Sequence, residues 1–169
     1  MDNSDIYAAT PIGMYRAKRS KALNNYKNWT YDTLTIPKGP YCGVVNVQGT
    51  LLCCYSRSSM DASIQGKDTL YSLINNAWAP YPPMAGKGQT ILKLGATYEN
   101  LYSTVDLIGL LVSDINTGIS KQHLTTYNGE VDYGTLRDSY IGKDYTGNIS
   151  YWLADQHFGL NQTYQYWDN

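Results

Sequence analysis

Short runs of β-branched and aromatic residues, each ending at Gly, Pro or Asn, constrain the fold of this chain more than any other feature. The runs "YCGVVNV" and "TLLCCYS" are typical of such segments. No stretch of ten residues repeats its apolar side chains with the 3.6-residue period of an amphipathic helix. The sequence therefore predicts an all-β fold.

Two sets of turn residues divide the first of these runs. Pro37-Lys38-Gly39-Pro40 predicts a turn, because proline fixes φ and glycine supplies a positive φ where one is needed. Gln48-Gly49 lies between two apolar runs and predicts a two-residue hairpin. Further along, a turn is expected near Gly95, and a last buried strand is expected from Val105 to Ile115.

The composition changes twice along the chain and suggests three parts. Residues 1–27 are predicted to be an N-terminal arm, and residues 28–118 a β-sandwich core. Residues 119–169 are rich in Tyr and in turn residues, and they are expected to form an extension that packs on the core or on a neighbouring subunit.

The N-terminal arm carries a concentration of basic residues. A short helix from Met14 to Leu23 is possible there, although its apolar stripe is thin. We interpret the segment as a docking arm that contacts another subunit or protein, rather than as a nucleic-acid-binding tail. The predicted docking residues are Arg16, Lys18, Arg19 and Lys21.

Aromatic side chains with a polar group dominate over purely apolar ones, with 17 Tyr and 4 Trp against one Phe. Tyr and Trp suit half-buried surfaces such as ligand faces and subunit interfaces, although they are also common on strand faces. Trp78 and Tyr81 are predicted to lie on the irregular backbone of a Pro-rich loop, and they are the candidate ligand-binding residues. The alternative is that they pack this loop onto the core.

Charge and cysteine content exclude several classes of protein. The net charge of −1 argues against nucleic-acid binding, and the longest apolar run is too short to insert into a membrane. Cys42, Cys53 and Cys54 are odd in number, and two are adjacent, so free thiols are expected rather than disulfides or a metal site. The start of the chain shows no secretory signal, so synthesis in a cytoplasm is expected.

Catalytic signatures are weak. Glu99 and Glu130 lie in turn-like contexts. Asp132, Asp138 and Asp144 recur every six residues. They could supply a glycosidase pair or a Ca²⁺ loop, but they fit solvated turns better. The sequence predicts a non-enzymatic protein with no catalytic residue, no metal and no cofactor.

Two segments carry a resemblance to a known family. "LTIPKGPYCGVV" and "TILKLGATYENLYSTVDLIGLLVSD" resemble the strands of the trimeric jelly-roll heads of phage tail-fibre and receptor-binding proteins, which share the C1q/tumour-necrosis-factor-like fold. The resemblance implies a jelly-roll β-sandwich, a homotrimer, other virion proteins as partners, location in the virion, and attachment to a host-surface saccharide. Two alternatives stay open: a structural virion component (capsid decoration or tail joining) without a ligand site, and a free-standing carbohydrate-binding module.

Overall fold

The computed structural model describes residues 5–32, 35–56, 68–81, 90–97, 100–106, 109–123, 126–127, 130–131, 136–155 and 159–164. In this part of the chain the strands form five antiparallel sheets. The prediction of an all-β chain built from packed antiparallel sheets is confirmed.

Sixteen strands and one short 3-10 helix make up the described fold. The first sheet contains β1 (Asp5–Thr10), β2 (Gly13–Lys18) and β3 (Thr30–Tyr31), with the 3-10 helix η1 (Tyr26–Asn28) before β3. The second contains β4 (Tyr41–Val47), β5 (Thr50–Tyr55), β6 (Thr69–Ile74) and β7 (Ala77–Pro80). The third contains β8 (Ile91–Ala96), β9 (Asn100–Val105), β10 (Gly109–Asp114) and β11 (Ser120–His123). A small ribbon of β12 (Thr126–Tyr127) and β13 (Glu130–Val131) precedes the last sheet, which contains β14 (Leu136–Lys143), β15 (Ile149–Asp155) and β16 (Gly159–Tyr164).

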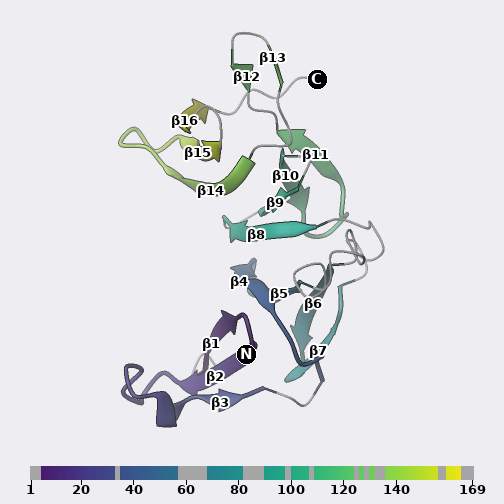
Figure 1. The fold of residues 1–169 in the computed structure, drawn as a ribbon, viewed down its shortest axis with the longest axis vertical. Helices are drawn as coiled ribbons and strands as arrows, with labels where there is room; N and C mark the ends of the chain where they lie inside the picture. Colours follow the sequence, from purple (N-terminus) through teal and green to yellow (C-terminus); the bar gives the residue numbers. More distant parts are fainter. Residues whose placement is uncertain are drawn as a thin grey trace.

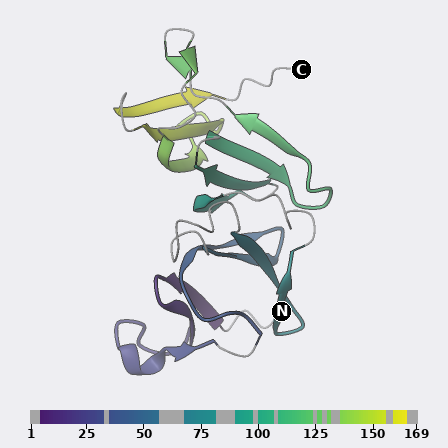
Figure 2. The ribbon, with the colours of Figure 1, turned by 45° about the vertical axis from the view of Figure 1, so that its right-hand side comes forward.

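The four larger sheets stack face to face in the order of the sequence and form an open arc (Figure 1). Their first strands lie in a row, with β4 between β1 and β8, and with β14 against β8. Figure 2 shows the first and last sheets at opposite ends of this stack. The blades of a β-propeller are arranged in a similar way, with successive sheets side by side and their first strands innermost.

Within each described sheet, every strand pairs with its neighbour in the sequence. This connection is a meander, whereas a jelly roll has the longer crossings of the Greek key. Among these connections, those between β4 and β5 and between β6 and β7 are two-residue loops, which can join only adjacent antiparallel strands. Gln48 and Gly49 both have positive φ, +49° and +80°, and this confirms the predicted two-residue hairpin between β4 and β5.

A second hairpin of the same kind was not predicted. Asn75 and Asn76, with φ of +51° and +63°, join β6 to β7. Asn tolerates the left-handed region, so the Asn-Asn pair between two apolar runs was a usable signal. Because of this turn, Trp78 lies in a regular strand rather than on the irregular backbone that the sequence suggested.

The connection from the first sheet to the second runs through the predicted Pro-Lys-Gly-Pro turn. Gly39 has a φ of +140°, as the prediction required. Two buried tyrosines of the second sheet hold this segment: the Tyr41 hydroxyl donates to the Pro37 carbonyl at 2.7 Å, and the Tyr55 hydroxyl donates to the Lys38 carbonyl at 3.1 Å. The turn is therefore an inter-sheet linker and not a hairpin.

Three hydrophobic cores fill the spaces between neighbouring sheets. Between the first and second sheets lie Met14, Ile36, Tyr41, Cys53, Tyr55, Leu73 and Trp78. Between the second and third lie Val47, Leu52, Cys54, Leu70, Tyr81, Ile91, Leu94, Leu101, Val105, Leu111 and Ile115. Between the third and last lie Tyr102, Leu110, Val112, Tyr151 and Leu153.

The middle sheets are buried on both faces. In β5, Cys53 packs toward the first sheet and Cys54 toward the third, as expected for adjacent residues of a strand. In β10, Leu111 packs toward the second sheet while Leu110 packs toward the last. Strands buried on both faces carry continuous apolar runs. The strand predicted from Val105 to Ile115 corresponds to β10, which is shorter (Gly109–Asp114), because Val105 is the last residue of β9.

Two local predictions are wrong. The segment proposed as a helix from Met14 forms β2 instead, because it pairs with β1 and buries Met14 against the second sheet. Gly95 is not a turn residue: it lies within β8 opposite Tyr102, where the Ile141 side chain comes within 3.6 Å of the position a Cβ would take.

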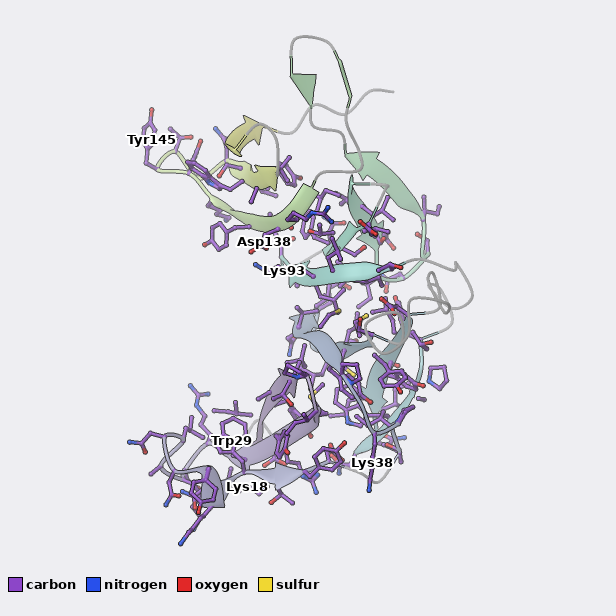
Figure 3. The ribbon with its side chains drawn as sticks, in the orientation of Figure 1. Lys18, Trp29, Lys38, Lys93, Asp138 and Tyr145 are labelled. Carbon is purple, nitrogen blue, oxygen red and sulfur yellow. The ribbon has the colours of Figure 1, made fainter. Side chains whose placement is uncertain are left out.

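The predicted N-terminal arm and C-terminal extension both contribute sheets that pack on their own chain in the described residues. β1 lies against β4, and β14 lies against β8 and β9. The Thr104 and Ser139 hydroxyls are hydrogen-bonded at 2.8 Å between the third and last sheets, and Lys93 faces Asp138 across the same boundary (Figure 3). Residues 165–169, with the aromatic end of the extension, lie outside the described residues, and the proposed domain boundaries stay a prediction.

We expect the fold to lose stability as the pH rises above about 10, where tyrosine titrates in an unfolded chain. Burial raises the pKa of Tyr41 and of Tyr151 above that value, so unfolding at alkaline pH releases protons that the folded protein retains. Thermal melts between neutral and strongly alkaline pH measure the effect. Tyr151→Phe should reduce the dependence on pH, whereas the 99% exposed Tyr145, changed to Phe, should not. Equal slopes for the two variants would contradict the account.

Candidate ligand cleft between the first two sheets

A cleft of about 830 Å³ opens between the first sheet and the second. One wall consists of the first sheet and the loop between β2 and β3, and it contributes Asp5, Tyr7, Arg16, Ala17, Lys18, Lys21, Lys27, Asn28 and Thr30. The other wall belongs to the second sheet, and it contributes Val44, Val45, Asn46, Leu51, Leu73 and Asn76. The first wall is therefore mainly polar and basic, and the second is mainly apolar with two amides.

The register of β1 and β2 explains why the cleft exists. Alternate pairs of the two strands face the second sheet, and their character changes along the strands from Ala9–Met14 through Tyr7–Arg16 to Asp5–Lys18. Met14 is fully buried in the core, where the two sheets are in contact. Tyr7 still packs at the edge of this core with Val44 and Leu51, and its polar neighbours Arg16, Asp5 and Lys18 line the cleft that begins there.

The polar pairs interact within the first sheet. Lys18 Nζ lies 2.8 Å from Asp5 Oδ1. The Arg16 side chain donates a hydrogen bond to the Tyr7 hydroxyl. Burial raises the pKa of Tyr7, and the hydrogen bond from Arg16 opposes this shift in part. Tyr7 therefore stays a neutral phenol at physiological pH and fixes one N–H of the Arg16 guanidinium.

The loop between β2 and β3 is held by its own hydrogen bonds, although most of it is exposed. The Trp29 indole N–H donates to the Leu23 carbonyl at 2.9 Å, and the Asn28 amide donates to the Ala22 carbonyl at 2.9 Å. The Asn25 side chain caps η1 by accepting from the Lys27 backbone N–H at 3.1 Å. Figure 3 shows Trp29 and Lys18 together at this end of the first sheet. Lys21 and Lys27 therefore project from an ordered loop.

The structure brings together most of the residues predicted as a docking arm. Arg16, Lys18 and Lys21 line one cleft, whereas Arg19 is exposed and does not line it. Sequence reasoning missed the amides of the second wall, Asn46 and Asn76. They come from other hairpins, and the packing of two sheets that places them opposite the arm leaves no local signal in the sequence.

The candidate ligand residues Trp78 and Tyr81 lie elsewhere, and their predicted exposure needs correction. Trp78 is 4% exposed: its indole N–H donates to Asp32 Oδ2 at 3.1 Å, and its ring meets that of Tyr7 edge to face. Tyr81 is 8% exposed, and its hydroxyl donates to the Ile115 carbonyl. Both side chains occupy inter-sheet cores, which supports the alternative in which they hold the fold together.

The described part of the chain holds neither a cluster of metal-ligating side chains nor a membrane-spanning helix. No group of three or more His, Cys, Asp or Glu side chains is placed to hold a metal ion there. None of the described residues forms a helix long and apolar enough to cross a membrane. Asp132 and Tyr133 of the Asp- and Tyr-rich segment lie outside the described residues.

Comparison with known proteins gives a likeness in fold alone. No protein-family model and no curated protein matches the sequence. Among solved structures, the chain is similar to the extracellular domain of a putative hybrid two-component system, BT3049, from B. thetaiotaomicron, with a TM-score of 0.56 and 16% identity. The match covers 95% of this chain and 19% of that structure, so the chain spans about a fifth of its length.

We expect Trp78→Ala to destabilise the protein by about 3–5 kcal/mol, as large aromatic truncations in a core do. The substitution empties part of the core between the first two sheets and leaves the buried Asp32 carboxylate without its indole donor. Chemical denaturation followed by circular dichroism measures the change. A variant as stable as the parent chain would contradict a structural role for Trp78 and would return it to the candidate ligand residues.

Proposed function

We propose that this chain is a non-enzymatic saccharide-binding module whose ligand lies in the cleft between the first and second sheets. The observation that carries the proposal is the lining of the cleft: side-chain amides and hydroxyls stand beside an apolar wall, in a volume of about 830 Å³. Ligand sites of small molecules usually have volumes of about 300–1,000 Å³.

The two walls suit the two sides of a sugar ring. Ring hydroxyls both donate and accept, and the amides of Asn28, Asn46 and Asn76 can do the same. The C–H groups of the ring are apolar and match Leu51 and Leu73 on the other wall. The Asn46 side chain is oriented by a hydrogen bond, because its Oδ1 accepts from the Gly49 N–H at 3.0 Å. Its amide NH₂ can then donate to a ring hydroxyl.

The carboxylate content of the cleft supports binding rather than hydrolysis. Glycosidases require two carboxyl groups across the scissile bond. The described lining holds one carboxylate, Asp5, which forms an ion pair with Lys18 and has no second carboxylate beside it in that lining. A nucleophilic thiol is not at hand either, because Cys53 and Cys54 lie in the cores, where burial raises the pKa of Cys53.

Recognition outside a cell agrees with the similar solved structure, which is an extracellular domain of a two-component system. Attachment of a virion to a host saccharide uses the same binding chemistry and stays a prediction, together with the homotrimer, the virion partners and the location in the virion. Light scattering of the purified protein tests the trimer directly, since a homotrimer has three times the chain mass of 19.0 kDa.

Titration calorimetry against a panel of neutral and acidic oligosaccharides tests the proposal. Asn76→Gly should weaken the binding of any ligand found by about two- to tenfold, the value of one hydrogen bond. Asn75→Gly is the matched control, because this residue shares the turn and the positive φ but does not line the cleft. Failure of the whole panel to bind, or equal losses in both variants, would contradict the proposed site.

A further inference from the structure

The lining of the cleft carries a net positive charge. Four of the chain's 13 lysines and arginines line the cleft, although the chain as a whole has a net charge of −1. These four cations face one carboxylate, Asp5, which leaves a formal charge of +3 in a space lined on one side by apolar groups. A neutral sugar does not require this arrangement, and an anion placed there would gain from it.

Three of the four cations form no ion pair in the described part of the chain, although Arg16 is hydrogen-bonded to the Tyr7 hydroxyl. The ion pairs within the described part of the chain involve Lys18, Lys93 and Arg137, and none of them involves Arg16, Lys21 or Lys27. Lys18 is held by Asp5. The remaining cations therefore keep their charge for a ligand.

Arg16 has the geometry to bind an acidic group. Its guanidinium carries five N–H donors in a planar fork, which matches the two oxygens of a carboxylate or sulfate. The hydrogen bond to the Tyr7 hydroxyl uses part of this capacity and orients the rest. Because Arg16 is half-buried, its attraction for an anion is screened less than that of a fully exposed side chain.

Lys21 and Lys27 extend the same site from the ordered loop. The Lys21 backbone N–H bonds to the Lys18 carbonyl at 3.0 Å, and Lys27 lies within η1, which Asn25 caps. Their backbones are fixed before a ligand arrives, so only their side chains lose freedom on binding. Two lysines beside one arginine can neutralise a charged group from a second side.

We propose that the ligand of this cleft is an acidic saccharide whose carboxylate or sulfate group is bound by Arg16 together with Lys21 and Lys27. The inference rests on the proposed function and adds the charge of the ligand. The amides and the apolar wall bind the ring, and the cations select the acidic substituent. Carboxylate and sulfate share this chemistry, so the choice between uronic acids and sulfated sugars belongs to the experiment.

The test is calorimetric titration of the full chain with uronic-acid oligosaccharides and sulfated disaccharides, each beside its carboxyl-reduced or desulfated counterpart. We expect an acidic member to bind at least tenfold more tightly than its neutral counterpart, and to weaken as sodium chloride is added. The acidic series that binds identifies the substituent.

Variants then assign the effect to the cleft. Arg16→Gln should weaken the acidic ligand about tenfold or more and leave its neutral counterpart within about twofold. A Lys21→Gln, Lys27→Gln double variant should act in the same direction. The control is Arg19→Gln, which removes the same charge from a neighbouring exposed residue outside the cleft and should leave binding unchanged. A melting temperature equal to that of the parent chain confirms that each variant is folded.

The outcomes separate this inference from the proposed function. If acidic and neutral sugars bind equally and Arg16→Gln changes neither, the inference is wrong and saccharide binding stands. If the acidic ligand loses the same affinity in Arg19→Gln as in Arg16→Gln, the attraction is a general charge effect, and the inference is also wrong. If no member of either series binds, both proposals fail.

Discussion

Side chains that alternate between two neighbouring sheets hold this structure together. In a strand of a middle sheet, one side chain lies in the core shared with the preceding sheet and the next lies in the core shared with the following sheet, as Cys53 and Cys54 do in β5. A one-residue slip would exchange the two sets and place each against the wrong neighbour. The packing of each middle sheet against both of its neighbours and the continuous apolar runs depend on this alternation.

The cleft begins where the side chains that the first sheet directs toward the second sheet change from apolar to polar. The first sheet meets the second through Ala9 and Met14, and further along the same face it presents Tyr7 with Arg16 and Asp5 with Lys18. An apolar pair there would have continued the core. A hydrogen-bonded pair and an ion pair instead line the cleft opposite Val44 and Leu51, and the loop between β2 and β3 adds two more cations to the lining. The proposed site thus continues the space of the core between the first two sheets, but with polar and charged side chains on one wall.

The sequence alone predicts those features of the fold that depend on residues adjacent in the chain. The all-β class, the Gln48-Gly49 hairpin, the positive φ of Gly39 and the opposite directions of Cys53 and Cys54 are all local consequences of residue type. The arrangement of the sheets is not local. Gly95 has the residue type of a turn but lies in β8, where it pairs with Tyr102 of β9 and has the Ile141 side chain of the last sheet beside it. The same limit applied to the site: the basic residues were visible as a cluster, but the wall that they face comes from β4, β5 and the β6–β7 turn. Trp78 and Tyr81 were expected at a surface because of their neighbouring prolines, and the adjacent sheets bury them instead.

Both proposals depend on the cleft between the first two sheets being a binding site. The most direct test is a map of amide chemical-shift changes in the isotope-labelled protein during titration with the acidic oligosaccharide that binds best. Binding in the cleft predicts changes confined to β1, β2, the loop that carries Lys21 and Lys27, and the parts of β4, β5, β6 and the β6–β7 turn that line the cleft. Changes centred on the third or last sheet, or none at saturating ligand, would contradict it.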